Sequence, residues 1–406
     1  MAEGHDGRDA SMKALGLNWQ IGSNYGWGTY GMELALHLLR RGGPMPVLLQ
    51  PAAELRADEL RFARLQQVIR ASAAVLEGRG RIDPRARGNG LVVAHALGNN
   101  AEPAFAPNRI AVAAEREVAL TFIENTACSD WARRRFASFP LVVAGSAWCR
   151  DMLAAQGASD PTVCIQGIDP TVFHPAPRLG EFRNRFTIFS GGKLEFRKGQ
   201  DIVLAACKAF RSRHPETLLV SVWGNAWTRS RGLAQFRHSP HVSGPPATSP
   251  ERGIDWNGWM TELDVGMNDI TMFGFFTHDR LPLLMREADV ALFPNRAEGG
   301  TNLVAMEAMA CGVPTILSAN TGHLDIIADG ACIPLRDQRP VAADEPGLGT
   351  EGWGESDIDE IVEALERVWQ DREAARAIGA AGAAHMARFA WAAQLDRLLG
   401  LIEGLG

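Results

Sequence analysis

Short apolar stretches alternate with stretches of helical periodicity along most of the chain. In the first half, the runs that indicate β-strands are "ALGLNWQI", "PVLL", "GLVVAHAL", "VALTFIENT", "FPLVVAGS" and "PTVCIQGI". Apolar residues recur at helical spacing in "MELALHLLRRGG", where Gly42 ends the predicted helix, and in "AWCRDMLAAQGA". Strands that alternate with helices are typical of parallel sheets built from βαβ units. The pattern therefore predicts an α/β fold.

The alternation of strand and helix patterns is interrupted once and then resumes. Residues 167–185 are rich in proline and polar residues and show no periodicity. Strand patterns then resume in "FTIFSGG", "TLLVSVWG", "DITMFGFF", "ADVALFP" and "VPTILS", with helices predicted in "GQDIVLAACKAFRSRHP" and "DRLPLLMREA". We predict two Rossmann-like domains, 1–175 and 176–385. Ligands of such sheets bind at the carboxyl ends of the strands, so the cleft between the domains is the expected site.

Residues 227–268 interrupt the second unit. They include "RHSPHVSGPPATSPERG", for which we predict a mobile loop, and "DWNGWM". The segment is either a surface insertion or a lid or acceptor-binding element whose exposed Trp residues contact a sugar or partner.

Composition narrows the class of protein. The chain has 406 residues, of which 46% are hydrophobic, so it is long enough for two domains and too apolar for disorder. A net charge of −6 gives no indication of nucleic-acid binding. We find no signal peptide and no run of ~18 apolar residues, so we expect a cytoplasmic protein without a transmembrane segment. Peripheral membrane contact stays open.

The six cysteines are scattered, without C-x-x-C spacing. We therefore expect reduced, mostly buried thiols and no metal site.

The stretch "NRAEGGTNLVAMEAMACGVPTI" carries the strongest chemical signal. Gly299 and Gly300 let backbone N–H groups converge, and Asn302 is predicted to cap a helix beginning near Leu303. A helix N-terminus is an anion site, suited to phosphate. A carboxylate at Glu307 cannot hold phosphate but can accept hydrogen bonds from ribose hydroxyls.

Glu298, on the other side of the turn, could bind a second hydroxylated group, so the arrangement favours a nucleotide-sugar. The alternative is a helix cap with solvated acids, which does not explain carboxylates on both sides.

This stretch resembles the signature of the retaining glycosyltransferases of family 4, which have the GT-B fold of two facing Rossmann-like domains. "VALFPNRAEGGTNLVAMEAMACGVPTILS" is similar to the family's strand, glutamate, glycine loop and "EAMAxGxPV", and "NLVAME" also resembles trehalose-phosphate synthases. The resemblance implies that Glu307 binds ribose and that Glu298 lies near the donor sugar, in a catalytic role. It also implies that the loop binds the diphosphate and sugar through Gly299, Gly300, Thr301, Asn302 and Leu303. The family has seven residues between the glutamates, whereas this chain has eight.

A second signature agrees in register. "FSGGKLEFRKGQDIVLAA" resembles the family's "GRLxxxKGxDxLIxA". Lys193 then replaces the usual Arg, and Lys198 matches the usual Lys; both are candidate catalytic residues. Gly192 and Arg197 are candidate donor ligands, and Arg197 could supply the missing guanidinium fork. Two cations on a Gly turn can neutralise a diphosphate leaving group, so we expect no metal and no cofactor.

Looser matches add further donor-site candidates. "SNYGWGTYGMELALHLL" occupies the place of the family's N-terminal Gly-rich loop, with Gly26 and Gly28 as donor-binding candidates and a plain tight turn as the alternative. In "DITMFGFFTHDRL", the family implies that backbone groups around Phe275 and Thr277 meet the nucleobase.

On the acceptor side, His95 in "VVAHALGNN" is a catalytic candidate because the family often places a His there, although a lone His is more often structural. A further family His is absent, because the corresponding run reads "TFIENT". Glu124 or Asn125 would face the acceptor instead.

The resemblance implies sugar transfer from a nucleotide diphosphate sugar to the hydroxyl of a carbohydrate, a lipid-linked or another acceptor, with retention of configuration. It also implies that helices at about 386–406 pack back on the N-terminal domain. The alternatives are a nucleotide-sugar epimerase or hydrolase on the same fold, and a non-catalytic nucleotide-binding scaffold.

Overall fold

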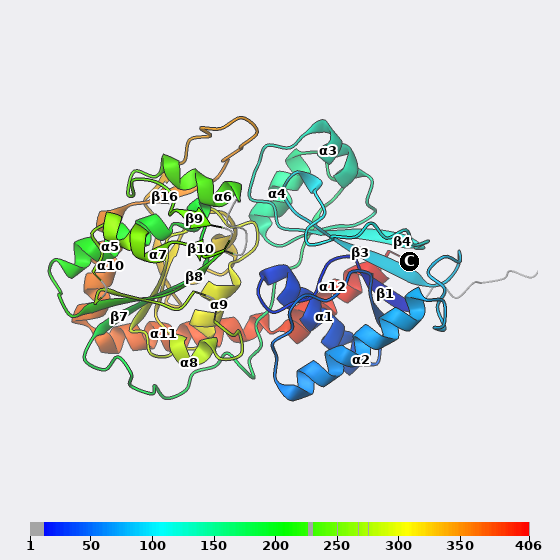
Figure 1. Cartoon of the computed structure of the whole chain (residues 1–406), viewed down its shortest axis with the longest axis horizontal. Helices are drawn as coiled ribbons and strands as arrows, with labels where there is room; N and C mark the ends of the chain where they lie inside the picture. Colours follow the sequence, from blue (N-terminus) through cyan, green and yellow to red (C-terminus); the bar gives the residue numbers. More distant parts are fainter. Residues whose placement is uncertain (1–11, 226–229, 250, 267, 275, 406) are drawn as a thin grey trace, which may run out of the picture.

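Two six-stranded parallel sheets form the framework of the protein. The computed structural model describes residues 12–225, 230–249, 251–266, 268–274 and 276–405. The strand orders are β2-β1-β3-β4-β5-β6 and β11-β8-β7-β12-β13-β14, with helices around each sheet (Figure 1). This architecture confirms the predicted pair of Rossmann-like domains.

The N-terminal sheet is apolar on both faces, as expected for a parallel sheet covered on both sides. Its strands are β1 (Ala14–Leu17), β2 (Met45–Leu48), β3 (Leu91–Leu97), β4 (Arg116–Thr121), β5 (Val142–Ala144) and β6 (Thr162–Val163). The accompanying helices are α1 (Gly26–Arg41), α2 (Glu59–Leu76), η1 (Asn99–Ala101), α3 (Asp130–Ala137) and α4 (Ala147–Ala155). Gly42, in the left-handed conformation at φ 64°, ends α1 as predicted.

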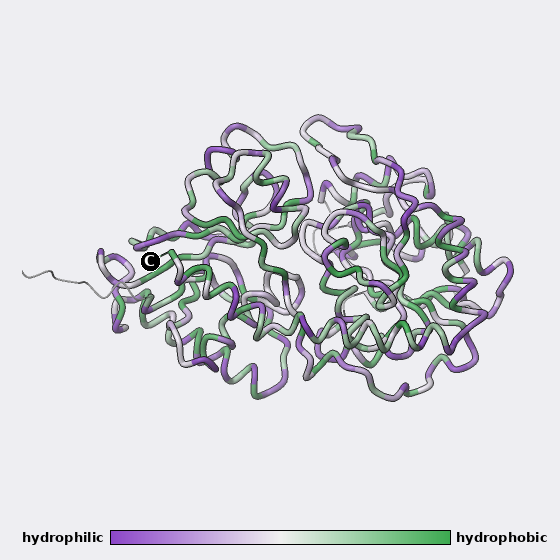
Figure 2. The backbone as a smooth tube through the Cα atoms, turned by 180° about the vertical axis from the view of Figure 1, so that it is seen from behind, coloured by the Kyte–Doolittle hydropathy of each residue, from purple (hydrophilic) through white to green (hydrophobic). Residues whose placement is uncertain are grey.

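The C-terminal sheet lies in the interior of the second domain, where its strands contribute to the hydrophobic core. In Figure 2 the strands of this domain are among the most hydrophobic segments of the chain. The strands are β7 (Phe186–Lys193), β8 (Thr217–Gly224), β11 (Ile270–Met272), β12 (Val290–Phe293), β13 (Thr315–Ser318) and β14 (Ile333–Leu335). Its helices are η2 (Phe196–Lys198), α5 (Gln200–Arg211), α8 (Leu281–Met285), α9 (Leu303–Ala310), η4 (Thr321–Asp325), α10 (Ile358–Gln370) and α11 (Arg372–Met386).

The insertion contains several short elements, and one of its Trp residues contradicts the prediction of an exposed contact. Its described part forms α6 (Arg231–Ala234), η3 (Gln235–His238), the antiparallel pair β9 (Thr248–Ser249) and β10 (Gly253–Ile254), and α7 (Trp256–Glu262). Trp259 is not an exposed sugar contact: it is 2% exposed, packs in the domain core, and donates its Nε1–H to the Gly244 carbonyl at 3.1 Å. Burial of the large apolar surface of a Trp ring stabilises the fold, so Trp259 packs inside although the sequence around it is polar.

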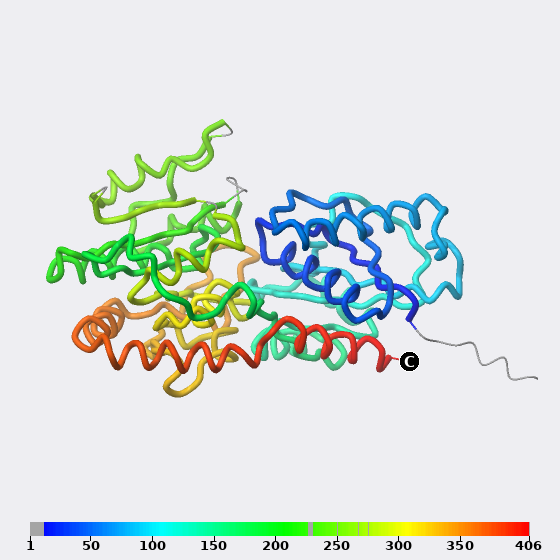
Figure 3. The backbone as a smooth tube through the Cα atoms, turned by 90° about the horizontal axis from the view of Figure 1, so that it is seen from below, coloured from blue at the N-terminus to red at the C-terminus, as the bar shows by residue number. Residues whose placement is uncertain are grey.

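The C-terminal helix crosses back to the first domain (Figure 3). After η5 (Ala387–Phe389), α12 (Trp391–Glu403) places Trp391, Leu395 and Leu398 in the same core as Leu15 and Leu17 of β1. No helix in the described ranges combines the length and apolar character needed to cross a membrane.

A long loop also joins the domains. β15 (Gln338–Pro340) and β16 (Gly354–Ser356) are antiparallel, and the 341–353 loop between them lies in the gap between the domains (Figure 1). Asn125 of the first domain donates to the Gly347 carbonyl at 2.8 Å and accepts from Gly349 N at 2.7 Å. Trp353 Nε1 donates to the Glu124 carbonyl at 2.9 Å.

Candidate functional site

A cavity of about 440 Å³ lies between the domains, at the carboxyl ends of strands from both sheets. It gathers ten of the predicted site residues: Gly26, Gly192, Lys193, Arg197, Lys198, Glu298, Gly300, Asn302, Leu303 and Glu307. Its first-domain wall is aromatic, with Tyr25 stacked on Phe105 at 4.2 Å and Trp27 against Phe122 at 4.4 Å between ring centroids.

The N-terminus of α9 forms one wall of the cavity. Among the described residues, the backbone N–H groups of Gly300, Thr301 and Asn302 donate to no protein acceptor. Together with the positive end of the helix dipole, they suit an anion. The prediction that the Asn302 side chain caps α9 is wrong. Asn302 occupies the N-cap position at φ 62°, but its Nδ2 lies 3.1 Å from Nε2 of His323 instead.

Glu298 is turned into the protein. Its carboxylate pairs with Lys198 Nζ at 2.5 Å and Arg197 Nη1 at 3.2 Å, and accepts from Asn295 Nδ2. Burial alone would raise the pKa of Glu298, but the two cations lower it to about 2. The carboxylate is therefore ionised and serves as the counter-ion of the cationic pair.

The three predicted cations differ in their surroundings. Arg197 is held by Glu195 at 2.9 Å, Glu298 at 3.2 Å and Glu124 of the first domain at 3.3 Å. Lys193 pairs with Glu195 at 2.6 Å, and its side chain is 36% exposed. Burial lowers the pKa of Lys198, and Glu298 offsets this effect only in part. An incoming anion beside Lys198 would restore its ordinary affinity for the proton.

Glu307 lines the same cavity from just over one turn into α9 and is 3% exposed. Its Oε1 lies 2.6 Å from His278 Nε2. Burial lowers the pKa of His278, but Glu307 outweighs it and the net shift is upward. Sequence reasoning missed His278, although it immediately follows Thr277, which was selected for its backbone.

His95 and Gly28 do not line the cavity, and Gly26 lines it from a helix. His95 is held between Asn18 at 3.0 Å and Glu117 at 2.9 Å and does not line it, so the structural alternative for His95 applies. Gly26 and Gly28 belong to the first turn of α1 and not to a loop. A Cβ at Gly28 would stand 2.2 Å from the Gly22 carbonyl oxygen, so glycine is required there for packing.

Gly299, Thr301 and Thr277 do not line the cavity but hold neighbouring backbone in place. Gly299 packs against the Ile123 carbonyl, where a Cβ would stand at 2.5 Å, and its own carbonyl accepts from Ser146 Oγ at 2.9 Å. Thr301 is fully buried, with Oγ1 at 3.0 Å from Met306 Sδ. The Thr277 carbonyl accepts from Arg280 and Leu281 and so begins α8, while its neighbours Phe276 and His278 line the cavity. Phe275 lies outside the described residues.

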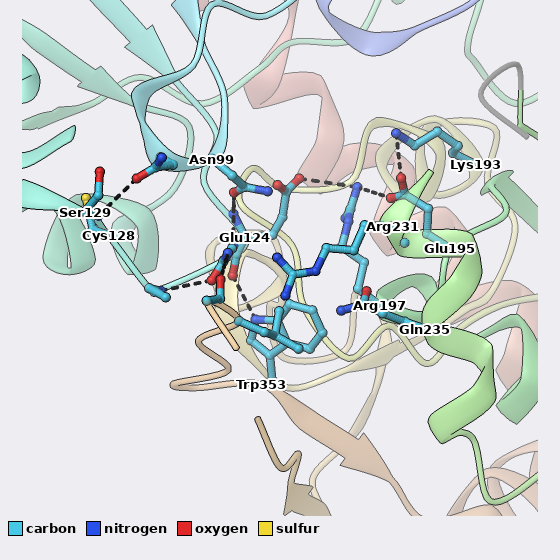
Figure 4. A pocket seen from close by; sticks show the side chains of 16 residues that line it. Asn99, Glu124, Cys128, Ser129, Lys193, Glu195, Arg197, Arg231, Gln235 and Trp353 are labelled. Atoms are coloured by element: carbon cyan, nitrogen blue, oxygen red, sulfur yellow. Dashed lines mark hydrogen bonds and ion pairs between the residues drawn. The ribbon is translucent and has the colours of Figure 1, made fainter. Parts of the chain in front are cut away.

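A second cavity, of about 660 Å³, adjoins the first and shares four lining residues with it: Asn99, Glu124, Lys193 and Arg197. Figure 4 shows Glu124 and Glu195 directed toward Arg197 at its centre. The predicted acceptor-side residues Glu124 and Asn125 line it, as do Arg231 and Gln235 of the insertion, which sequence reasoning did not single out.

Comparison with known proteins places these features in a family context. Residues 269–398 match the family model described as "Family 4 Glycosyltransferase in conflict systems". A D-inositol 3-phosphate glycosyltransferase of Segniliparus rotundus is 30% identical over 252 residues, covering 60% of this chain and 47% of that protein. A GDP-mannose-dependent alpha-(1-6)-phosphatidylinositol monomannoside mannosyltransferase of Mycobacterium tuberculosis is 27% identical over 253 residues, covering 59% and 54%. The chain thus spans about half the length of these curated relatives.

Solved structures share the fold. The sucrose-phosphate synthase of Thermosynechococcus elongatus superposes with a TM-score of 0.64 at 16% identity, covering 97% of this chain and 99% of that one. Anabaena HepE, solved in complex with UDP and glucose, gives 0.62 at 14% identity, covering 97% and 100%.

Proposed function

We propose that this chain, which is similar to family 4 glycosyltransferases over residues 269–398 and shares the fold of the sucrose-phosphate synthase, transfers a sugar from a nucleotide diphosphate sugar to an acceptor hydroxyl. We further propose that configuration is retained and that no metal or other cofactor takes part. The observation that carries the proposal is the single cavity in which the α9 N-terminus, Lys198 and Glu307 converge. The glycosyltransferase names of the relatives and the UDP and glucose complex of HepE support the same substrate class.

In this proposal the donor lies along the cavity from Glu307 to Glu298. The diphosphate meets the unpaired N–H groups of Gly300 to Asn302, and Lys198 turns from Glu298 to a phosphate oxygen. The Glu307 carboxylate, held by His278 through Oε1, accepts hydrogen bonds from ribose hydroxyls. The nucleobase lies beside Phe276 and Gly274.

The transfer step forms a bond from the acceptor oxygen to the anomeric carbon while the bond from that carbon to the diphosphate breaks. The acceptor proton passes to the departing diphosphate oxygen on the same face, which preserves the configuration. Lys198 and the helix N-terminus stabilise the negative charge as it develops, with Lys193 near the exit. Positive charge fixed in a buried site performs this task without a metal ion.

The second cavity is proposed to hold the acceptor. It opens onto the first at Glu124 and Arg197, where an acceptor hydroxyl could approach the sugar. Its polar side chains favour a hydroxylated acceptor, either a carbohydrate or the head of a lipid-linked one.

To test the function, the protein is incubated with uridine and guanosine diphosphate sugars and a panel of hydroxyl acceptors. Released nucleoside diphosphate gives the rate, and NMR of the product gives the anomeric configuration. We expect Lys198→Ala and Glu307→Ala to lose at least about 100-fold in kcat/KM, whereas Lys208→Ala, at an exposed site on α5, retains full activity. Chelation with EDTA should leave the rate unchanged.

Undiminished turnover in both cavity variants would overturn the site assignment. Full-rate release of free sugar, or sugar epimerisation without an acceptor, would establish the hydrolase or epimerase alternative. Donor binding without turnover on any acceptor would establish the scaffold.

A further inference from the structure

The turn that follows β3 places two asparagine side chains on the first-domain wall of the second cavity. Asn99 lines both cavities and so lies at the boundary between them, whereas Asn100 lines the second. The backbone of this turn is strained, because Asn100 and Ala101 follow each other in the left-handed region, at φ 58° and 56°. Glycine enters this region without cost, and other residues do so rarely. Backbone held in this way is typical of functional sites.

Backbone contacts fix the direction of the Asn99 amide. Its Oδ1 accepts from the N–H of Glu124 at 2.8 Å and from the N–H of Asn125 at 3.0 Å. A backbone N–H group only donates, so the amide atom that faces both must be the oxygen, and Nδ2 lies on the other side. Among the described residues, Asn99 Nδ2 donates to no protein acceptor. Asn99 therefore offers a fixed N–H donor at the boundary of the two cavities.

Glu124 supplies a hydrogen-bond acceptor at the same place. Its backbone N–H binds the Asn99 amide, and Figure 4 shows its carboxylate directed toward Arg197. Within the described ranges this carboxylate makes one ion pair, with Arg197 at 3.3 Å. A carboxylate has about four acceptor sites, so Glu124 can accept a further hydrogen bond. An N–H donor beside a carboxylate suits a hydroxyl group, which accepts and donates at the same time.

The position of Asn99 and Glu124 limits which hydroxyl they can bind. The transferred sugar is proposed to lie in the first cavity and the acceptor in the second, so the attacking hydroxyl lies at their boundary. Its proton passes to the departing diphosphate in the proposed step and is not available to Glu124. The hydroxyl bound by Asn99 and Glu124 is therefore a second one. Because it lies at the same boundary, it belongs to the carbon next to the attacking hydroxyl.

We propose that Asn99 and Glu124 together bind one hydroxyl of the acceptor, on the carbon adjacent to the attacking hydroxyl, and so restrict the acceptor to molecules with two adjacent hydroxyls. Asn99 Nδ2 donates to this hydroxyl, and the Glu124 carboxylate accepts from it. The inference rests on the proposed glycosyltransfer and deepens it, because it selects a carbohydrate or cyclic polyol over an alcohol with one hydroxyl. A site that hydrogen-bonds a hydroxyl strongly rejects analogues that lack it.

The test compares Asn99→Asp with the wild type. Aspartate has the same shape as asparagine and keeps an oxygen for the N–H groups of Glu124 and Asn125. It replaces the N–H donor at the boundary with an acceptor, which cannot bind the oxygen of the hydroxyl. The substitution thus removes the proposed contact and leaves the turn in place.

Two control variants make the same substitution elsewhere. Asn100→Asp adds a negative charge to the second cavity away from the boundary, and it keeps the contact of Oδ1 with the N–H of Ser129, at 3.0 Å. Asn184→Asp adds the charge at an exposed position between the domains. Both controls should stay within about threefold of the wild type in kcat/KM, because a charge without a directed contact has a small effect in a hydrated site.

The acceptors are methyl glucoside, methyl galactoside and methyl mannoside, the monodeoxy derivatives of the one used fastest, and 1-hexanol, which has a single hydroxyl. We expect Asn99→Asp to lower kcat/KM for the fastest glycoside about tenfold or more and to equal the wild type with one monodeoxy derivative. NMR of the product identifies the carbon that receives the sugar, and the sensitive hydroxyl should be on a neighbouring carbon. The donor KM and the slow transfer to water should not change, since neither involves this hydroxyl.

The inference is overturned if Asn99→Asp and the wild type show the same ratio of rates for every derivative, or if the sensitive hydroxyl is not adjacent to the glycosylated carbon. It is also overturned if Asn100→Asp has the same effect as Asn99→Asp, or if hexanol is as good an acceptor as the glycosides. A wild-type protein that releases nucleoside diphosphate from no donor contradicts the proposed function instead, so the two failures are distinguishable.

Discussion

At the scale of a single residue, the buried imidazole of His323 makes the stability of the fold depend on pH. Its pKa falls from 6.5 to about 4 on folding, so the unfolded chain binds more protons between these values. Stability therefore rises with pH in this window and is lost as pH falls through it. We predict that the wild type loses about 2 kcal/mol more free energy of unfolding between pH 7 and pH 5 than His323→Gln does.

Urea titrations at both pH values measure this difference, and the other titrating groups cancel because both proteins contain them. Equal losses in the two proteins would show that the His323 pKa is not depressed.

Glu298 shows what a sequence can and cannot predict about a residue. The sequence motifs alone predict that Glu298, Glu307 and Lys198 belong to one site, and all three line the same cavity. The pattern could not tell that Glu298 faces inward, because this depends on Lys198 and Arg197 from a turn about 100 positions earlier in the chain. Gly299, in the loop that has one residue more than the family pattern, packs against the Ile123 carbonyl of the other domain, a contact without any local signal.

At the scale of elements, the sequence pattern predicted every strand of the N-terminal sheet and all strands of the C-terminal sheet except β14, because most buried strands are continuous apolar runs. The predictions were wrong at segments whose local structure is determined by tertiary packing. The SNYGWG stretch yields the first turn of α1, since Gly28 fits against Gly22, and the insertion yields a packed layer because Phe236 and Trp259 enter the core. Nothing in the local sequence distinguishes these outcomes from a loop.

η4 and the 298–302 loop form one unit through a close backbone contact. A Cβ at Gly322 would stand 1.6 Å from the Gly300 carbonyl oxygen and 2.8 Å from that of Glu298. Backbone cannot move aside as a flexible side chain can, so Gly322→Ala should displace the loop. We predict that this substitution lowers the free energy of unfolding by on the order of 1–3 kcal/mol and weakens the binding of nucleoside diphosphate at least about tenfold. Thermal unfolding measures the first effect and calorimetry the second.

Gly400→Ala is the matched control, because a Cβ at this exposed position of α12 meets nothing within 4 Å. It should be neutral or slightly stabilising. If Gly322→Ala binds nucleoside diphosphate normally, the loop is not held by η4.

The whole molecule is a pair of domains joined at more than one place, and the 341–353 loop is the connection closest to the proposed acceptor cavity. Glu345 anchors this loop to the insertion through Arg237 at 2.6 Å, Arg231 at 3.0 Å and His238 at 3.0 Å. The far side of the loop contacts Asn125 and Glu124 of the first domain. Ion pairs near the surface contribute about 0.2–1 kcal/mol each, so the cluster as a whole is worth on the order of 1 kcal/mol.

We predict that Glu345→Gln raises the acceptor KM about fivefold while the donor KM stays unchanged, because the donor residues lie on other elements. Amide hydrogen exchange should quicken in both 124–126 and 344–350, and 1 M salt should give the wild type the same behaviour. The control is Glu351→Gln, on the same loop, since the Glu351 carboxylate makes no ion pair with any described residue. If the two variants behave alike, or if Glu345→Gln changes the donor KM instead, the loop does not couple the insertion to the acceptor side of the cleft.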